Sequence, residues 1–145
     1  MSKPAVLEII DVHPGTTAQL EQSYTLHRLW QADDPKALIA KVAPEIRGLV
    51  TNGIAGVKGE VIEALPKLEI IGVLGVGVDS VDLAAAKAQG VRVTNTPDVL
   101  TTGVAELAMA LLLDVARKVT ANDRYVRAGR WPEEGDPPLA RSLFG

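Results

Sequence analysis

The groups best suited to chemistry in this sequence are the backbone amides of a glycine-rich segment, Thr51–Val57, which reads TNGIAGV. The segment follows a strand-like apolar run and precedes a helical one. It therefore lies beyond the carboxyl end of a strand, where open α/β sheets bind ligands. Gly53 and Gly56 allow backbone N–H groups to turn towards an anion, and the start of the next helix favours negative charge. An ordinary tight connection would have the same composition, and both interpretations stay open at this point.

Two other segments have similar turn chemistry. Gly72–Asp79 reads GVLGVGVD and resembles the start of a dinucleotide fingerprint, but Ser80 or Val81 stands where its last glycine belongs. No helix is expected to start there until after Asp82, so we reject a Rossmann phosphate site at this segment. Asn95–Asp98 is a turn by composition, and composition alone gives it only a weak claim to function.

Other catalytic groups are few. His13 and His27 are the only histidines, and no serine or carboxylate stands at a spacing that would make either a catalytic base. We expect both to be structural or solvent-facing. The chain has no cysteine, which excludes a disulfide framework, a thiolate metal site and a cysteine nucleophile. No cluster of metal ligands is present in the sequence, so we expect no metal site.

The composition is that of a folded globular protein. The chain has 145 residues, a formal net charge of −3, 47% hydrophobic and 23% charged residues. Slight acidity argues against nucleic acid as a partner, because nucleic-acid-binding surfaces are usually basic. The longest apolar run, within residues 104–116, falls short of the roughly 20 residues that a bilayer requires. No secretory signal is recognisable at the N-terminus. We therefore expect no membrane association and a cytoplasmic location.

Strand-like and helix-like patterns alternate along the first 98 residues, and the strands are apolar on both faces, as in a parallel sheet that helices cover on both sides. This alternation predicts an α/β fold, a flavodoxin-like doubly wound parallel sheet of five strands. The expected strands are Val6–Val12, Tyr24–Leu29, Ile46–Thr51, Leu68–Leu74 and Val91–Thr94. The expected helices are Thr16–Gln22, Pro35 to about Val42 with Asp34 as N-cap, Val57–Leu65, and a short one from Asp82 to Gly90.

The last third of the chain has a different pattern. A single long helix is expected over residues 101–128, capped by Thr101 or Thr102 and ended by Gly129. Its first half is apolar nearly all round and should be buried. Residues 129–145 form an extended arm with no evident core. We expect a division into a domain at 1–98, an interdomain or dimerisation helix at 99–128 and the arm. This helix and arm should dock onto a second subunit or a further domain.

Three motifs resemble one family in order and spacing. They are LPKLEIIGVLGVGVDSVDL at 65–83, GVRVTNTPDVL at 90–100 and VAEL at 104–107. Together they are similar to the D-isomer-specific 2-hydroxyacid dehydrogenases, and the resemblance covers essentially the whole chain. Within that family, NTPDVLT at 95–101 and DRYVRAGRW at 123–131 most resemble the glyoxylate/hydroxypyruvate and hydroxyphenylpyruvate reductases.

The resemblance implies roles for six residues. The loop matching Ile54, Ala55 and Gly56 offers main-chain N–H groups to the substrate carboxylate, and Gly77 adds a main-chain contact to the substrate. The positions matching Val76 and Val104 contact the cofactor, which is NAD or NADP in the full-length family. Both are valines here, so their contacts would come from the main chain or from packing.

The resemblance also implies what this sequence does not contain. In the family, a strand and a GxGxxG motif follow a position like Gly145, and the catalytic arginine, glutamate and histidine lie further on. None of these maps to a residue here. A helix from the far C-terminus, which completes the family's substrate domain, is likewise absent. We therefore expect the N-terminal, substrate-binding half of an NAD(P)-dependent oxidoreductase that reduces 2-oxoacids. Alone, it should bind substrate weakly and cofactor not tightly, and it should be inactive.

Alternatives from other classes remain. The chain could be a free-standing flavodoxin-like binding or interaction module, or a folding unit without enzymatic activity. Gly15-Thr16-Thr17 stands where flavodoxins bind a flavin phosphate, although the full serine- and threonine-rich loop is missing. The long helix could pair across a homodimer or fold back over the surface left by the absent C-terminal helix, and we favour the dimer. The substrate's side chain and the choice between NAD and NADP stay open.

Overall fold

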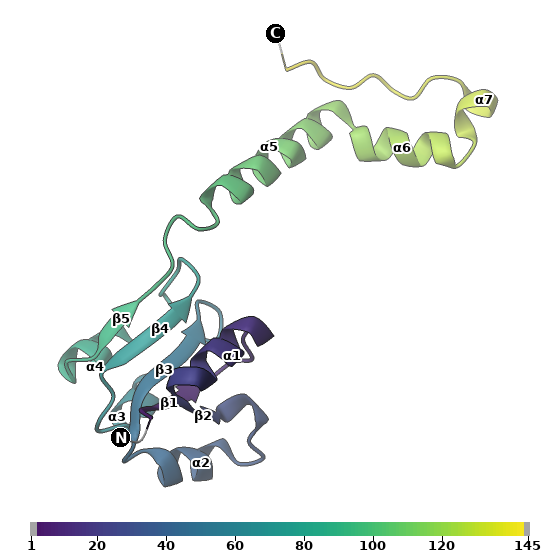
Figure 1. Cartoon of the computed structure of the whole chain (residues 1–145). Coiled ribbons are helices and arrows are strands. Elements are labelled where there is room, and N and C mark those ends of the chain that lie inside the picture. Colours follow the sequence, from purple (N-terminus) through teal and green to yellow (C-terminus); the bar gives the residue numbers. More distant parts are fainter. Residues whose placement is uncertain (1–2, 144–145) are drawn as a thin grey trace. The chain divides into compact units, whose positions relative to one another are not determined.

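The computed structural model describes residues 3–143, which divide into two compact units. The first unit ends at Pro97 and the second begins at Asp98. Each is described below by itself. The first unit has the α/β architecture that the sequence predicts, and Figure 1 shows its sheet and surrounding helices.

The sheet of the first unit has five strands, all parallel, in the order β2-β1-β3-β4-β5. This is the flavodoxin-like order expected above. The strand predicted to reach Val12 already ends at Glu8, where its pairing with β2 also ends. The strands are β1 (Ala5–Glu8), β2 (Thr25–Arg28), β3 (Ile46–Asn52), β4 (Ile70–Leu74) and β5 (Arg92–Thr94).

Side-chain caps start three of the helices. Asp34 Oδ1 accepts the Ala37 N–H at 3.0 Å, and Asp82 Oδ1 accepts the Ala85 N–H at 2.9 Å. His13 Nδ1 accepts the Gly15 N–H at 3.1 Å, so His13 has a structural role, as expected. Each cap satisfies an amide that the helix itself leaves unpaired. The helices of this unit are α1 (Pro14–Ser23), α2 (Pro35–Val42), α3 (Gly59–Glu63) and α4 (Leu83–Ala88), and a 3-10 turn, η1, spans Leu29–Gln31.

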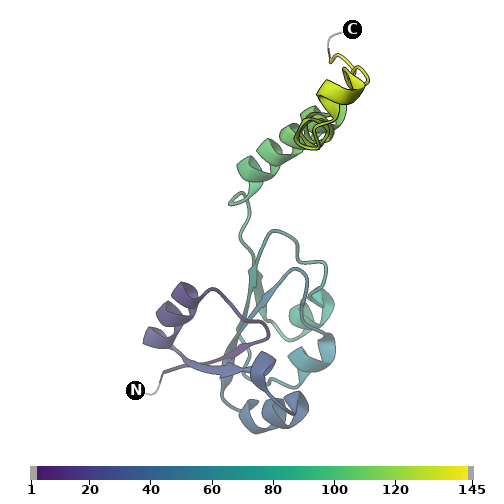
Figure 2. The same ribbon diagram turned by 90° about the vertical axis from the view of Figure 1, so that its right-hand side faces the viewer.

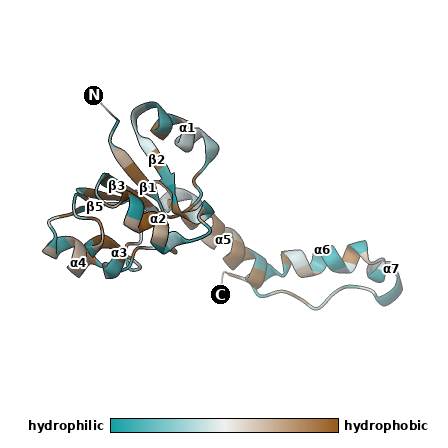
Figure 3. Cartoon of the chain, turned by 90° about the horizontal axis from the view of Figure 1, so that it is seen from below, coloured by the Kyte–Doolittle hydropathy of each residue, from teal (hydrophilic) through white to brown (hydrophobic). Residues whose placement is uncertain are grey.

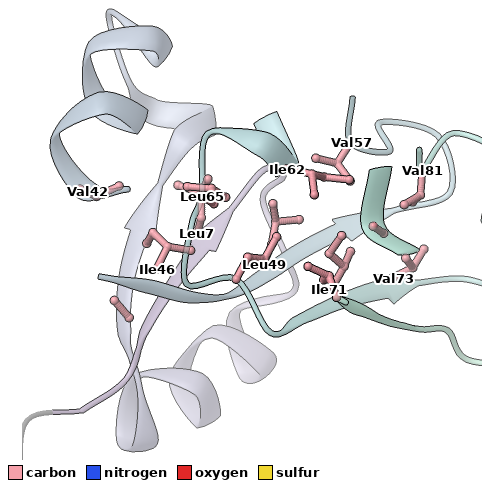
Figure 4. Packing of buried hydrophobic residues seen from close by; sticks show 14 residues of the cluster. Leu7, Val42, Ile46, Leu49, Val57, Ile62, Leu65, Ile71, Val73 and Val81 are labelled. Carbon is pink, nitrogen blue, oxygen red and sulfur yellow. The ribbon is translucent and has the colours of Figure 1, made fainter. Parts of the chain in front are cut away.

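The core lies between one face of the sheet and helices α2, α3 and α4 (Figure 4). Strand residues Leu7, Leu49 and Ile71 pack there against Val42 of α2 and Ile62 of α3. All five are essentially inaccessible to water, and burying a side chain of this size contributes about 1.5–3 kcal/mol.

The opposite face of the sheet is covered less completely than the sequence suggests. Among the described helices of the first unit, only α1 lies on this side, as Figure 2 shows. Ile70 and Leu74 of β4 stay 39% and 42% exposed. A mostly apolar groove of about 300 Å³ runs over β1, β3 and β4 beside α1, lined in part by Val6, Leu20 and Gly48. Coverage by helices on both sides therefore holds for part of the sheet only.

The second unit corrects the prediction of one long helix. The chain forms α5 (Thr101–Arg117) and α6 (Val119–Arg127), separated by Lys118 in the left-handed conformation, with φ 54°. Asp114 stabilises the break, because its carboxylate accepts the Thr120 N–H at 2.6 Å and the Thr120 hydroxyl at 2.9 Å. These hydrogen bonds hold the pKa of Asp114 below its ordinary value. The expected cap is wrong as well, since Leu100 occupies the N-cap of α5 without a side-chain hydrogen bond.

The arm after Gly129 is more ordered than expected. It contains a short helix, α7 (Arg130–Glu134), and then returns along the second unit. The Tyr125 hydroxyl donates to the Gly135 carbonyl at 2.9 Å, and the Arg141 N–H donates to the Ala116 carbonyl at 3.1 Å. One side-chain and one backbone hydrogen bond thus hold the arm to its own unit.

Apolar side chains dominate the surface of α5, which is largely brown in Figure 3. In the single chain these side chains are not buried: Val104, Leu107, Leu111 and Val115 are each more than half exposed. Even so, within residues 3–143 no helix is long and apolar enough to cross a membrane.

Glu8 leads to a prediction about the pH dependence of stability. Its side chain is 1% exposed, Oε2 lies 3.5 Å from Arg28 Nε, and Oε1 has no hydrogen-bond partner. Burial raises its pKa above 4.5, and the nearby Asp11 and Glu21 carboxylates act in the same direction, whereas Arg28 opposes them. The native state therefore binds the Glu8 proton more tightly than the unfolded chain does. Stability should fall as the pH rises from 4.5 through the raised native pKa.

Urea denaturation between pH 5 and pH 8 tests this expectation. Glu8→Gln, which cannot ionise, should be more stable than the natural chain at pH 8, and the difference should shrink towards pH 5. A difference that stays constant over this range would show that the Glu8 carboxyl does not titrate as described.

Candidate functional site

Three loops meet at the carboxyl edge of the sheet in the first unit. They are residues 53–57 after β3, 75–81 after β4 and 95–97 after β5. Because β3, β4 and β5 are parallel neighbours, their carboxyl ends lie at the same edge. The three segments that the sequence singles out are therefore adjacent in space.

The first loop takes its shape from Gly56, which has φ +60° and is buried. The Gly56 N–H donates to the Asn52 carbonyl at 2.9 Å, and the Gly56 carbonyl accepts the Thr51 hydroxyl at 2.7 Å. Thr51 is fully buried, so this hydroxyl has no contact with water. Residues 52–56 therefore form a closed turn with satisfied backbone groups at its base.

One side-chain and one backbone hydrogen bond join the first and second loops. The Ser80 hydroxyl donates to the Gly53 carbonyl at 2.7 Å, and the Val57 N–H donates to the Ser80 carbonyl at 3.0 Å. A methyl group on Gly53 would lie 2.7 Å from the Gly77 carbonyl oxygen. Only glycine at position 53 permits this approach, which brings the turn containing Ile54 next to Gly77.

The third loop braces the second. The Asn95 side-chain amide donates to the Val76 carbonyl at 2.8 Å. Thr96 and Gly75 are joined twice, because the Gly75 N–H donates to Thr96 Oγ1 at 3.0 Å and the Thr96 N–H donates to the Gly75 carbonyl at 2.9 Å. The turn at Asn95–Asp98 thus positions the Val76-Gly77 backbone.

Two of the predicted substrate residues present converging amides. The N–H groups of Ile54 and Ala55 point to one atom, the Asn52 side-chain oxygen, at 3.0 Å and 2.7 Å. Both residues are exposed, Ile54 by 92%. Gly56 shapes the turn, since its own N–H is used by the Asn52 carbonyl. Gly77 is exposed, and its N–H has no hydrogen-bond acceptor among residues 3–143.

The electrostatic character of the site comes from backbone amides. The helix that follows the first loop, α3, has five residues and starts only at Gly59, so the expected contribution from a helix N-terminus is not present at Ile54. Asp79 is the only titratable side chain in the three loops. Its Oδ2 would lie 3.3 Å from a methyl group on Gly77, which makes the Gly77 side of the site less favourable for an anion than the Ile54 side.

The residues present fit only part of a dinucleotide. Val76, 51% exposed, offers an apolar surface suited to packing against a nicotinamide ring. The segment directly after β4 offers no helix N-terminus with free amides for the phosphates of a dinucleotide. The next helix, α4, begins only at Leu83, and the Asp82 carboxylate already caps it. Val104, exposed on α5, belongs to the second unit.

The residues that the structure describes do not support a metal site or a flavin site. There, no group of three or more His, Cys, Asp or Glu side chains could hold a metal ion. Gly15, Thr16 and Thr17 form the start of α1, and all three of their N–H groups donate to the side chain or carbonyl of His13. His27 lies in β2 with Nε2 3.6 Å from Glu45 Oε1, outside the three loops.

The sequence reasoning did not single out the polar side chains that hold these loops together. They are Thr51, Asn52, Ser80, Asn95 and Thr96. One of them left a local signal: asparagine side chains accept hydrogen bonds from amides two residues further along the chain, and Asn52-Gly53 is such a turn former. The Ser80 and Asn95 contacts join segments 27 and 19 residues apart, so no local pattern reveals them.

Comparison with known proteins identifies the family. The model of the D-isomer specific 2-hydroxyacid dehydrogenase catalytic domain matches residues 5–131. A 2-ketogluconate reductase of Gluconobacter oxydans is 42% identical over 142 residues, which cover 98% of this chain and 44% of the relative.

Two solved structures extend the comparison. A 2-hydroxyacid dehydrogenase from Ketogulonicigenium vulgare Y25 is 43% identical with a TM-score of 0.93, covering all of this chain and 46% of its own. An NADPH-dependent glyoxylate/hydroxypyruvate reductase from Sinorhizobium meliloti, solved in complex with NADP and malonate, is 33% identical with a TM-score of 0.81, covering 99% of this chain and 44% of its own.

This chain thus spans between 44% and 46% of the length of these relatives. The family match covers most of the 145 residues and includes the sheet, the three loops, α5 and α6. The chain belongs to the D-isomer-specific 2-hydroxyacid dehydrogenase family.

Proposed function

We propose that this chain binds the carboxylate of a 2-oxoacid, of the glyoxylate or hydroxypyruvate type, for reduction by an NAD(P)-dependent dehydrogenase. The observation that carries the proposal is that the amides of two exposed residues, Ile54 and Ala55, converge on a single oxygen atom. Converging backbone N–H groups of this kind suit a carboxylate, and charge-assisted hydrogen bonds are about twice as strong as neutral ones. The malonate in the Sinorhizobium meliloti complex supports a carboxylate as the ligand.

When bound, the nicotinamide cofactor would supply the hydride needed to reduce a 2-oxoacid. The residues of this chain bind and orient the substrate. Ile54 and Ala55 hold the carboxylate, and the free Gly77 N–H gives a second main-chain contact from the adjacent loop. Val76 provides an apolar wall for the nicotinamide, and Val104 of α5 also packs against the cofactor. Two fixed contacts to one small substrate restrict its orientation, which accelerates a reaction by proximity.

We propose further that these 145 residues by themselves do not turn over substrate and do not bind NAD(P) tightly. The three loops contain no histidine, lysine or arginine that could give a proton to the developing alkoxide, and Asp79 is their only acid. The segment after β4 lacks a phosphate cradle. Weak binding of the carboxylate is the measurable activity expected of this chain.

Titration of the ¹⁵N-labelled chain with glyoxylate tests the proposal. The Ile54 and Ala55 amide resonances should shift with a single dissociation constant in the millimolar range. Methyl glyoxylate, which lacks the negative charge, should produce much smaller shifts at the same concentration. NADPH oxidation in the presence of glyoxylate should not exceed the protein-free rate. Saturable shifts that avoid the first loop, or no saturable shift at all, would contradict the proposed carboxylate site.

We propose a homodimer through the helices of the second unit. The exposed leucines and valines of α5 lie at helical spacing, and water contact with a surface of this size is unfavourable. Sedimentation at about 10 µM should give a dimer, and the pair Leu111→Glu and Val115→Glu should convert it to a monomer by placing charges in the interface. Glu133→Gln, an exposed change on α7, serves as the control. A natural chain that sediments as a monomer would contradict the dimer.

A further inference from the structure

Asn52 occupies the amides that the proposed function assigns to the substrate. Its side-chain oxygen accepts the Ile54 N–H at 3.0 Å and the Ala55 N–H at 2.7 Å. A carbonyl oxygen has two lone pairs, so these two bonds use its full acceptor capacity. In the free chain, the place of a carboxylate oxygen is thus filled by an oxygen of the protein itself.

The shape of the loop does not depend on this side chain. Four other interactions fix the turn at its base and flank: Gly56 N–H to the Asn52 carbonyl, Thr51 hydroxyl to the Gly56 carbonyl, Ser80 hydroxyl to the Gly53 carbonyl, and Val57 N–H to the Ser80 carbonyl. Gly56 also packs so closely against the Ser80 carbonyl that an added methyl group would lie 1.9 Å from its oxygen. Loss of the Asn52 carboxamide should therefore free two amides while the turn keeps its form.

We propose that Asn52 is a positioning residue that holds the two amides in the free chain and yields them to the substrate carboxylate. The exchange favours the substrate, because an ionised carboxylate accepts these N–H groups more strongly than a neutral carboxamide does. It also has a cost, because the carboxylate must displace an internal hydrogen-bond partner. Asn52 therefore satisfies the two amides in the free chain and lowers the affinity of the site for the carboxylate. This inference rests on the proposed carboxylate site.

Three variants distinguish this role of Asn52 from a purely structural one. Asn52→Ala should lower the dissociation constant for glyoxylate about five-fold, which corresponds to about 1 kcal/mol, the net value of one hydrogen bond. Asn52→Asp should raise it at least about ten-fold, because the ionised side chain binds the amides more strongly and repels the ligand. Asn122→Ala, a change of the same type on α6, should leave it unchanged. The readout is the ¹⁵N titration at Ile54 and Ala55.

A measurement on the natural chain gives an independent test, whatever the folding of the variants. The Asn52 side-chain NH₂ resonances should shift with the same dissociation constant as the Ile54 and Ala55 amides, since displacement moves the carboxamide.

The two proposals can fail separately. If glyoxylate saturates the Ile54 and Ala55 amides but Asn52→Ala binds it equally or more weakly, or the NH₂ resonances stay fixed, Asn52 is not displaced and only the present inference is overturned. If no chain shows saturable shifts at these amides, the carboxylate site is wrong and the role of Asn52 falls with it.

Discussion

Replacement of Gly56 by alanine should lower the free energy of unfolding of the first unit by about 3 kcal/mol. Two costs combine in this substitution. Gly56 has φ +60°, where an L-residue with a Cβ is strained by roughly 1–2 kcal/mol. The added methyl group would also lie 1.9 Å from the Ser80 carbonyl oxygen, so the first two loops must separate, and overpacking of this kind costs about 1–3 kcal/mol.

Gly90→Ala is the matched control. Gly90 also has a positive φ, +73°, but an added methyl group there meets no atom within 4 Å. Gly90→Ala therefore has the backbone strain of a positive φ but no steric collision. Its free energy of unfolding should fall by only about 1 kcal/mol. Urea denaturation followed by circular dichroism measures both variants. Equal losses would show that the loops separate without cost and that the contact with Ser80 is unimportant.

The same substitution connects stability with the proposed function. Ile54 and Ala55 belong to the first loop and Gly77 belongs to the second, and the two loops touch at Gly53 and Gly77. Separation of the loops therefore moves Ile54 and Ala55 away from Gly77. Glyoxylate should therefore bind Gly56→Ala more weakly than Gly90→Ala under conditions in which both are folded. This difference would show that the contact between the loops sets the geometry of the site.

The fold of the first unit was largely predictable because its signals are local. Alternating apolar runs predict the five strands, and Asp34 and Asp82 cap the helices that the sequence assigns to them. Strand ends are less predictable: Val12 is buried and apolar like a strand residue, but β1 ends at Glu8, where its pairing with both β2 and β3 ends. The length of a strand depends on its partners, which the local pattern does not contain.

The break at Lys118 shows a second limit. Residues 101–128 have an apolar periodicity that continues through the break, and no proline marks it. The break is stabilised by two hydrogen bonds between Thr120 and Asp114, six residues apart: the Thr120 N–H, one of the first amides of α6, and the Thr120 hydroxyl both donate to the Asp114 carboxylate. Side-chain hydrogen bonds of this kind offer the backbone an alternative to a continuous helix, and the two differ only slightly in free energy. The apolar periodicity does not contain this difference, so it predicts one helix.

Some features of the candidate site can likewise be predicted from the sequence, and others depend on long-range contacts. The positions of Ile54, Ala55 and Gly77 at one sheet edge follow from the order of parallel strands. The need for glycine at positions 53 and 56 does not follow from the strand order. A side chain at Gly53 would collide with the Gly77 carbonyl oxygen, and one at Gly56 would collide with the Ser80 carbonyl oxygen. The sequence shows that the loop contains glycines, and only the structure shows what they approach.

Thr51→Val should cost about 2 kcal/mol, although it preserves the shape of the side chain. Thr51 is fully buried, and its hydroxyl donates to the Gly56 carbonyl at 2.7 Å. Valine leaves that carbonyl without this donor in a buried position, and an unsatisfied buried polar group costs about 1–3 kcal/mol. The effect should appear as a lower urea midpoint with an unchanged m-value, because the folded state stays compact.

Two companion variants identify the hydroxyl as the cause. Thr51→Ser keeps the donor and removes a methyl group, so it should lose only about 1 kcal/mol. Thr94→Val removes a hydroxyl whose oxygen lies 3.4 Å from the Ile71 carbonyl on an exposed strand residue, and it should change stability by about 0.5 kcal/mol or less. If Thr51→Val were as stable as the natural chain, the Gly56 carbonyl would have to find another donor. The first loop would then be free to move, and the convergence of the Ile54 and Ala55 amides would not be a fixed property of the fold.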